Sequence, residues 1–433
     1  MKKNKFAQSK AVNFILFLIT CCIVFSECLP LDILAADTSS ISYVIYECDT
    51  KQTLEKHNTE VIADCSLLAR LMTCLLVYEN PSLSVTDYVT PTENSTSLSG
   101  RYSLTASNQY MVDHLLKAVI LCNADNAARV LAEKINPNKE YFVSLMNQKA
   151  IEIGLKNTYF TNPDGSPDEL QRTTVNDMSV FLTYAMSNVQ FRNTAANPAA
   201  HIWGGTAVIN ECKLVSGSAF TNASVTSGAL AVYNTEENLS TTMLYFVGTQ
   251  TNNTPAVKLS MVISGISPES AYEFGVNFIN NVFLNYKKTA IVKKGDTLIT
   301  TKVGRSDLLI NANETRYCMI PADVSNYVEN ISYNITQKST TSTVPGNAVT
   351  LEDLDAPIEK DSIIGTANYL LKDGSIHSVS IIAGNSVHSD NKAINLFYKT
   401  IQENTDIFIL ISVLILLEIF LVLIFVINKL RNK

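Results

Sequence analysis

Two side chains near the start of a predicted helix, Ser66 and Arg70, have the types and the spacing of a candidate nucleophile and its neighbour. Residues four apart lie on one face of an α-helix, so the hydroxyl and the guanidinium would be close. A serine becomes a nucleophile when an adjacent base takes its proton. A guanidinium has a pKa above about 12 and no acceptor, so Arg70 cannot be that base. We therefore expect Ser66 to be an ordinary hydroxyl near the helix start.

Two other short segments offer polar groups to a site. Asn123-Ala124-Asp125 supplies an amide and a carboxylate between two apolar stretches. Thr226-Ser227-Gly228 supplies hydroxyls in a β-rich stretch, and its glycine could let a strand edge approach a peptide backbone. No metal-ligating cluster, phosphate-binding loop or second catalytic set is present, so no cofactor or metal is expected. The histidines are scattered along the chain, and each is predicted to be a structural or a surface residue: His57, His114, His201, His377 and His388.

Helices and strands that would position these groups follow from the hydrophobic pattern. Apolar residues at helical spacing predict a helix over 65–79, which carries Ser66 and Arg70. Further helices are predicted over 108–120, 125–135, 140–153, 174–186 and 267–286. Strands are predicted over 41–47, 206–212, 229–233, 242–248 and 258–263. This mixture predicts an α+β domain over residues 37–286.

The character of the chain changes after residue 286. Short β-rich stretches alternate with turn residues such as Gly295-Asp296 and Asp373-Gly374. The stretches cover residues 290–292, 297–303, 369–371 and 376–382. We therefore expect a small all-β domain over 287–388, followed by a linker over 389–406.

Several stretches, taken in order, resemble one protein family. Arg70-Leu71-Met72-Thr73 is similar to the K-I-M-T that follows a serine nucleophile, and Asn162-Pro163-Asp164-Gly165 is similar to a loop after an S-x-N helix. The segment 257–265 resembles the strand after K-T-G. This order resembles the low-molecular-weight penicillin-binding proteins, the serine-type D-alanyl-D-alanine carboxypeptidases of peptidase family S11. The resemblance implies a transpeptidase/β-lactamase-like domain, a small all-β domain and a C-terminal transmembrane helix.

The resemblance also implies where the catalytic residues would stand, and none of them is intact. In S-x-x-K the serine attacks the penultimate D-alanine and the lysine takes its proton. Leu67 occupies the serine position and Arg70 the lysine position. Ser66 stands one residue early, about 100° around the helix from the family position.

The other two motifs are altered as well. Asn123 and Asp125 occupy the serine and asparagine positions of S-x-N. Asp125 would repel the carboxylate of a D-Ala-D-Ala peptide, and it either pairs with Arg70 or is solvated. K-T-G corresponds to Thr226-Ser227-Gly228, with Val215-Ser216-Gly217 as the alternative. Neither contains the lysine.

The two ends of the chain suggest export and a membrane anchor. A signal peptide over 1–36 is predicted from the N-terminal lysines, an apolar stretch over 11–25 and Leu34-Ala35-Ala36. An uncleaved anchor is the alternative. Residues 407–427 are apolar except for Ser412 and Glu418, long enough for a bilayer core of about 30 Å. Basic residues follow in the tail 428–433, which predicts a cytoplasmic C-terminus and extracellular main domains at the cell membrane.

Composition adds limits on function and on cysteine chemistry. The 433 residues carry a formal net charge of −7, which gives no sign of nucleic-acid binding. Three of the nine cysteines precede residue 37. No two cysteines form a C-x-x-C pair, so buried free thiols are expected, with a disulfide left open. The others are Cys48, Cys65, Cys74, Cys122, Cys212 and Cys318.

These observations predict a membrane-anchored, extracellular, D-alanyl-D-alanine carboxypeptidase-like protein of the cell wall that is a catalytically inactive pseudoenzyme. As a binding or regulatory module, it would bind a peptidoglycan stem peptide or another cell-wall membrane protein, and no nucleic acid. The alternative is an active serine-type D-Ala-D-Ala carboxypeptidase with displaced catalytic residues.

Overall fold

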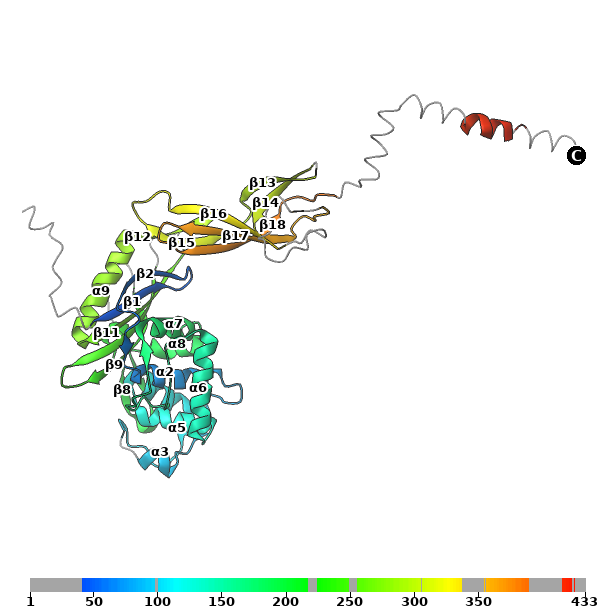
Figure 1. Cartoon of the computed structure of the whole chain (residues 1–433). Helices are drawn as coiled ribbons and strands as arrows, with labels where there is room; N and C mark the ends of the chain where they lie inside the picture. Colours follow the sequence, from blue (N-terminus) through cyan, green and yellow to red (C-terminus); the bar gives the residue numbers. More distant parts are fainter. Residues whose placement is uncertain are drawn as a thin grey trace, which may run out of the picture. The chain divides into compact units, whose positions relative to one another are not determined.

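The computed structural model describes residues 41–97, 100–216, 224–248, 255–304, 306–336, 354, 356–388, 415–422 and 424. The chain divides into two compact units (Figure 1). The first unit is formed mainly by residues 53–248 and 256–281, and the second mainly by residues from 282 onwards. The predicted signal peptide over 1–36, the linker over 389–406 and the tail over 428–433 lie outside the described residues.

A five-stranded sheet forms the centre of the first unit. Its spatial order is β2 (Gln52–His57), β1 (Ser42–Glu47), β11 (Val257–Ile266), β10 (Leu239–Gly248) and β9 (Ser224–Asn234). The pairs β1–β11, β11–β10 and β10–β9 are antiparallel. The first strand of the chain therefore lies beside one of the last in this unit, with Val44 opposite Val262.

Side chains alternate across this sheet and bury both of its faces. Tyr43 points to helix α9 (Pro268–Asn285), where its ring centroid lies 4.7 Å from that of Phe274. Val44, the next residue, belongs to the core shared with the remaining helices. Figure 1 shows α9 on one side of the sheet and α2, α7 and α8 on the other. The sheet is thus covered on both faces.

The helices opposite α9 enclose the main hydrophobic core. They are α2 (Ser66–Glu79), α3 (Glu93–Ser97), α4 (Val112–Cys122), α5 (Asp125–Ile135), α6 (Lys139–Ile153), α7 (Val175–Ala185) and α8 (Val189–Ala195). Helix α2 is central, because nine of its residues are buried. Helix α6 begins where the Asn138 side chain accepts a hydrogen bond from Tyr141 N at 2.6 Å, and ends at Gly154, whose φ is 88°.

Short strand pairs and turns complete the first unit. They are β3 (Ile62–Ala63) with β6 (Thr173–Thr174), β4 (Tyr88–Val89) with β5 (Tyr110–Met111), and β7 (Ala199–His201) with β8 (Ala207–Ile209). The strand predicted over 206–212 is shorter than expected. Asn210 ends it, because the Asn210 carboxamide accepts a hydrogen bond from Cys212 N at 2.9 Å and turns the chain into the 3₁₀ helix η2 (Lys213–Ser216).

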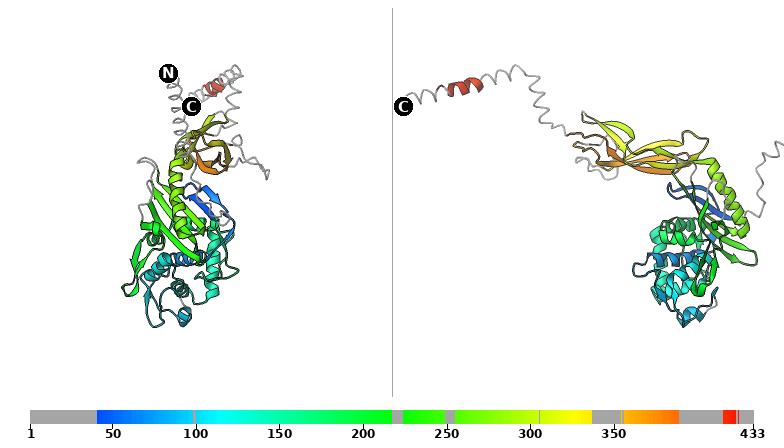
Figure 2. Two further views of the ribbon diagram at one scale, coloured as in Figure 1. Left: turned by 90° about the vertical axis from the view of Figure 1, so that its left-hand side faces the viewer. Right: turned by 180° about the vertical axis from the view of Figure 1, so that it is seen from behind.

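The second unit is built from strands, as predicted. Its five-stranded sheet has the order β13 (Thr297–Val303), β14 (Ser306–Ala312), β18 (Ile376–Ala383), β17 (Ile363–Leu371) and β16 (Val328–Ile335), and β12 (Tyr286–Val292) pairs with β15 (Arg316–Pro321). Figure 2 shows this sheet from two further directions. Alternate residues such as Leu308 and Ile310 are fully buried. Gly374, with φ of 81°, closes the turn between β17 and β18.

The predicted transmembrane helix over 407–427 is wrong. Nowhere in the described part of the chain does a helix combine the length and the apolar character needed to cross a bilayer. Within this segment the structure describes a helix over 415–422, which is about 12 Å long against a hydrocarbon core of about 30 Å. The predicted localisation, a cell-membrane anchor with extracellular domains and a cytoplasmic tail, rested on that helix and is corrected with it.

Candidate functional site

The first turn of α2 buries the residue at the predicted nucleophile position. Leu67 has no exposed surface and belongs to the main core, so hydrocarbon fills this position. The neighbouring Ser66 hydroxyl donates to the carboxylate of Asp64, whose Oδ1 also accepts the Ser66 backbone N–H at 3.0 Å. Ser66 thus takes part in a local turn at the helix start, and its hydroxyl faces an acceptor two residues earlier rather than Arg70.

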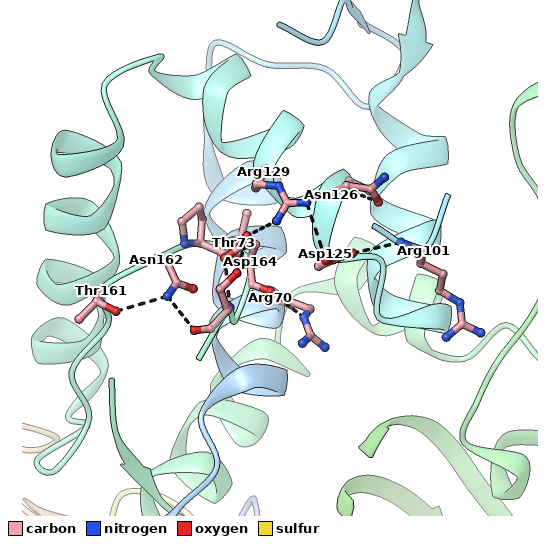
Figure 3. A network of polar contacts seen from close by, with 12 residues as sticks. Arg70, Thr73, Arg101, Asp125, Asn126, Arg129, Thr161, Asn162 and Asp164 are labelled. Atoms are coloured by element: carbon pink, nitrogen blue, oxygen red, sulfur yellow. Dashed lines mark hydrogen bonds and ion pairs between the residues drawn. The ribbon is translucent and has the colours of Figure 1, made fainter. Parts of the chain in front are cut away.

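Arg70, at the predicted lysine position, is held by hydrogen bonds that it donates. Its Nε lies 2.8 Å from the carbonyl oxygen of Asp164 (Figure 3). Its Nη1 lies 3.5 Å from Asn123 Oδ1. Burial lowers the pKa of Arg70, and the charges of nearby carboxylates, first that of Asp125, oppose the change. The guanidinium acts here as a donor that ties α2 to two neighbouring segments.

The Asn162-Pro163-Asp164-Gly165 turn packs directly on α2. Thr73 Oγ1 donates to the Pro163 carbonyl at 2.7 Å. Gly165 has a φ of 71°, and a Cβ at this position would lie 2.3 Å from the Ser66 carbonyl oxygen. A glycine is therefore required for this close approach, because any side chain would meet the helix backbone.

Asp164 in this turn is a buried carboxylate that sequence reasoning did not place in the site. It forms an ion pair with Arg129 of α5, and Ser166 Oγ donates to it at 2.9 Å. Figure 3 shows Asp164 between Arg70 and Arg129. The Asn-Pro-Asp-Gly pattern indicated the turn, but no sequence signal indicated Arg129 as its partner.

Asn123 and Asp125 flank the junction of α4 and α5. Asn123 ends α4 in the left-handed conformation with φ of 54°, and its Nδ2 donates to Glu211 Oε2 at 2.6 Å. Asp125 Oδ2 lies 3.7 Å from Arg129 Nη2, and Oδ1 accepts the Arg101 backbone N–H at 3.2 Å. We expected Asp125 to pair with Arg70 or to be solvated. Among the described residues its ion pair is instead with Arg129, one helical turn away.

Thr226-Ser227-Gly228 lies in β9, where the Ser227 side chain is buried. Ser227 has no exposed surface, and its Oγ donates to the Arg192 carbonyl at 3.2 Å. A Cβ on Gly228 would lie 2.8 Å from Cys212 Sγ. Cys212 therefore fills the space beside this face of Gly228, and the approach of a peptide backbone to the strand edge stays a prediction. In the alternative segment, Val215 and Ser216 lie in η2, and Gly217 lies outside the described residues.

A cleft of about 640 Å³ opens beside these motifs. Charged and polar side chains line it together with a few apolar ones: Arg70, Arg101, Asn123, Ile209, Asn210, Glu211, Lys213, Pro268, Glu269 and Tyr272. Arg101 forms an ion pair with Glu211. Burial acts to lower the pKa of Arg101, but Glu211, Cys122 and Tyr102 together outweigh it and the net shift is upward. Burial raises the pKa of Tyr272 to about 12. Over the described residues, neither Ser66 nor Leu67 is part of this lining.

Other reactive groups of the described chain do not form a second site. Cys65, Cys74, Cys122 and Cys212 are buried thiols that are not part of a disulfide. Burial raises the pKa of Cys65 and of Cys74 well above the ordinary range, which makes both poor nucleophiles. Within the described ranges, no group of three or more His, Cys, Asp or Glu side chains could hold a metal ion.

Comparisons with known proteins identify a matching family, related sequences and a structure with a similar fold. Residues 32–215 match the family described as D-alanyl-D-alanine carboxypeptidase. The D-alanyl-D-alanine carboxypeptidase DacF of Bacillus subtilis is 33% identical over 144 residues, which are 32% of this chain and 37% of that protein. DacA of Haemophilus influenzae is 30% identical over 146 residues, with the same coverage of 32% and 37%. The matched region thus spans little more than a third of these relatives. The structure of penicillin-binding protein 5 from Haemophilus influenzae is 21% identical, covers 80% of this chain and 97% of that chain, and has a TM-score of 0.63, which shows the fold.

Proposed function

We propose that the chain is a D-alanyl-D-alanine carboxypeptidase-like protein, as the family match over residues 32–215 indicates, and that it is a peptidoglycan-associated pseudoenzyme. In this proposal the chain keeps the penicillin-binding fold, does not form an acyl-enzyme, and acts as a binding or regulatory module. Its partner is a peptidoglycan stem peptide or another protein of the cell wall. The family relationship supports the cell-wall setting, and the side chains at the motif positions support the loss of catalysis.

The side chain at the nucleophile position is the observation that carries the proposal. Acyl transfer needs a nucleophilic atom next to a base. Leu67 has no such atom and no exposed surface. Arg70 has no acceptor, and its Nε is engaged by the Asp164 carbonyl at 2.8 Å. Both halves of the nucleophile–base pair are therefore missing, whatever the remaining residues do.

An active enzyme with displaced residues would need Ser66 as its nucleophile. Its hydroxyl donates to Asp64, and in the described structure Ser66 does not line the cleft in which a substrate would lie. These two facts favour the pseudoenzyme over a displaced catalytic serine.

Labelling with a fluorescent penicillin tests the loss of catalysis, because the label is covalent and requires an activated serine. The purified chain should give no labelled band under conditions in which penicillin-binding protein 5 from Haemophilus influenzae is labelled. D-alanine release from a pentapeptide, measured in parallel, should not exceed that of a heat-inactivated sample. A labelled band that disappears in Ser66→Ala would establish the displaced nucleophile and reject the proposal.

Binding needs a separate measurement, because the absence of catalytic activity does not by itself imply that the protein binds a partner. The chain should co-sediment with purified peptidoglycan sacculi, or crosslink to a protein of the cell wall in intact cells. Failure of both experiments would reject the binding role while leaving the loss of catalysis intact.

A further inference from the structure

The cleft of the first unit already contains a carboxylate, which belongs to Glu211. Each of its oxygens has a donor: Asn123 Nδ2 lies 2.6 Å from Oε2, and Arg101 ion-pairs with Oε1. The Glu211 side chain is 26% exposed, so it lies in the cleft wall within reach of solvent. Two charge-assisted contacts on one carboxylate are the pattern by which proteins bind a carboxylate ligand.

The donors are oriented before Glu211 reaches them. Asn123 Oδ1 faces Arg70 Nη1 at 3.5 Å, and a guanidinium only donates, so the amide must turn its Nδ2 toward Glu211. Arg70 is itself fixed by the Asp164 carbonyl. Asn123 also ends α4, which fixes its backbone. The cleft therefore presents preformed donors to whichever carboxylate lies there.

Only the Glu211 side chain would have to move to empty this position. Its backbone is held on both sides, by the Glu211 N–H donating to the Leu121 carbonyl at 2.9 Å and by Tyr272 Oη donating to the Glu211 carbonyl at 2.9 Å. A glutamate side chain changes rotamer on the nanosecond timescale when it is not fully buried. Opening the position thus requires a rotamer change and no rearrangement of the chain.

We propose that Arg101, Asn123 and Arg70 form a carboxylate-binding site that Glu211 occupies as an internal ligand. An external carboxylate then binds only by displacing the Glu211 side chain, which lowers its apparent affinity by the fraction of time that the site is open. Glu211 would in this way regulate access of a ligand to the cleft, an inference that rests on the proposed non-catalytic function. The ligand must carry a carboxylate group.

Chemical complementation tests this directly, because Glu211→Ala removes a CH₂–COO⁻ group, the size of acetate. The full-length variant should melt about 2–4 °C below the wild type, the shift expected when a domain of this size loses a contact of this kind. Sodium acetate should raise its Tm relative to sodium chloride at equal ionic strength. The wild type should show no such difference.

Two further variants identify the site. Glu269→Ala removes another glutamate of the same cleft, one whose carboxylate lies 3.9 Å from Lys213, and should gain no response to acetate. Arg101→Ala combined with Glu211→Ala should lose the response, because the charged donor is gone. An equal response in the wild type, or in the Glu269 variant, would overturn the proposal.

A binding measurement keeps the test informative if Glu211→Ala does not fold. Glu211→Gln preserves the side-chain shape and removes its charge. Acetate titrated by NMR should bind it about tenfold more tightly than the wild type, the factor for a site open about a tenth of the time. Equal affinities would refute an internal ligand. Penicillin labelling plays no part in this experiment, so failure here and failure of the proposed function are distinguishable.

Discussion

Placing a serine at position 67 would show whether the residues around this position can support acylation. The variant Leu67→Ser, alone and with Arg70→Lys, supplies the nucleophile and the base that the family uses. We expect neither variant to be acylated, because Asn123, Asp125 and Thr226 also depart from the family motifs. We also expect a clear loss of stability, since Leu67 belongs to the main core.

The size of that loss follows from burial. Leu67 has no exposed surface, and truncating a fully buried leucine costs about 2–5 kcal/mol. Residue 67 lies in the first turn of α2, so the carbonyl four residues earlier belongs to Ala63 of β3, outside the helix, and burial of the new hydroxyl adds to the loss. We expect a decrease of about 3–5 kcal/mol in the free energy of unfolding. Typical totals are about 5–15 kcal/mol, so the variant should still fold.

Urea denaturation and fluorescent-penicillin labelling measure the two effects. Leu76→Ser is the matched control, because Leu76 lies on the same helix but is only partly buried, and its loss should be smaller. A loss below about 1 kcal/mol for Leu67→Ser would contradict the packing of α2. Labelling of the double variant to the level of an active relative would show that the remaining site is intact, and would refute the reasoning from the other motifs.

Three further outcomes are expected. Asp164→Asn should lower the free energy of unfolding in urea by about 3–5 kcal/mol, because Arg129 loses a buried partner; no change would mean that the pair is solvated. Gly165→Ala should lower Tm more than Gly154→Ala, since both have positive φ but only position 165 brings a Cβ within 2.3 Å of helix backbone; equal shifts would contradict that contact. Burial raises the pKa of the Cys74 thiol above its ordinary 9.0, so the folded state keeps a proton that the unfolded state loses as pH rises above that value. Stability should therefore fall above about pH 9, and Cys74 should resist iodoacetamide until the chain is unfolded, as mass spectrometry can check.

Local patterns in the sequence were sufficient for much of the scaffold. The helix predicted over 65–79 is α2, and the strand predicted over 297–303 is β13 with identical bounds. Strand β16 was not predicted, although Ile331, Tyr333 and Ile335 alternate with polar residues as in a half-buried strand. The apolar run over 407–427 predicted a spanning helix that the structure does not support, because a hydropathy pattern indicates a preference for lipid and not the length of a helix.

The sequence alone was enough to show that position 67 offers no nucleophile and position 70 no base. A leucine has no nucleophilic atom and a guanidinium has no acceptor, whatever fold surrounds them. The tertiary structure decided which distant side chains surround these two positions. Glu211 contacts Asn123 from 88 residues away, and Asp164 contacts Arg129 from 35 residues away. Helical neighbours lie at fixed spacings along the chain, but such distant pairs depend on the path of the whole chain, so only the folded molecule brings them together.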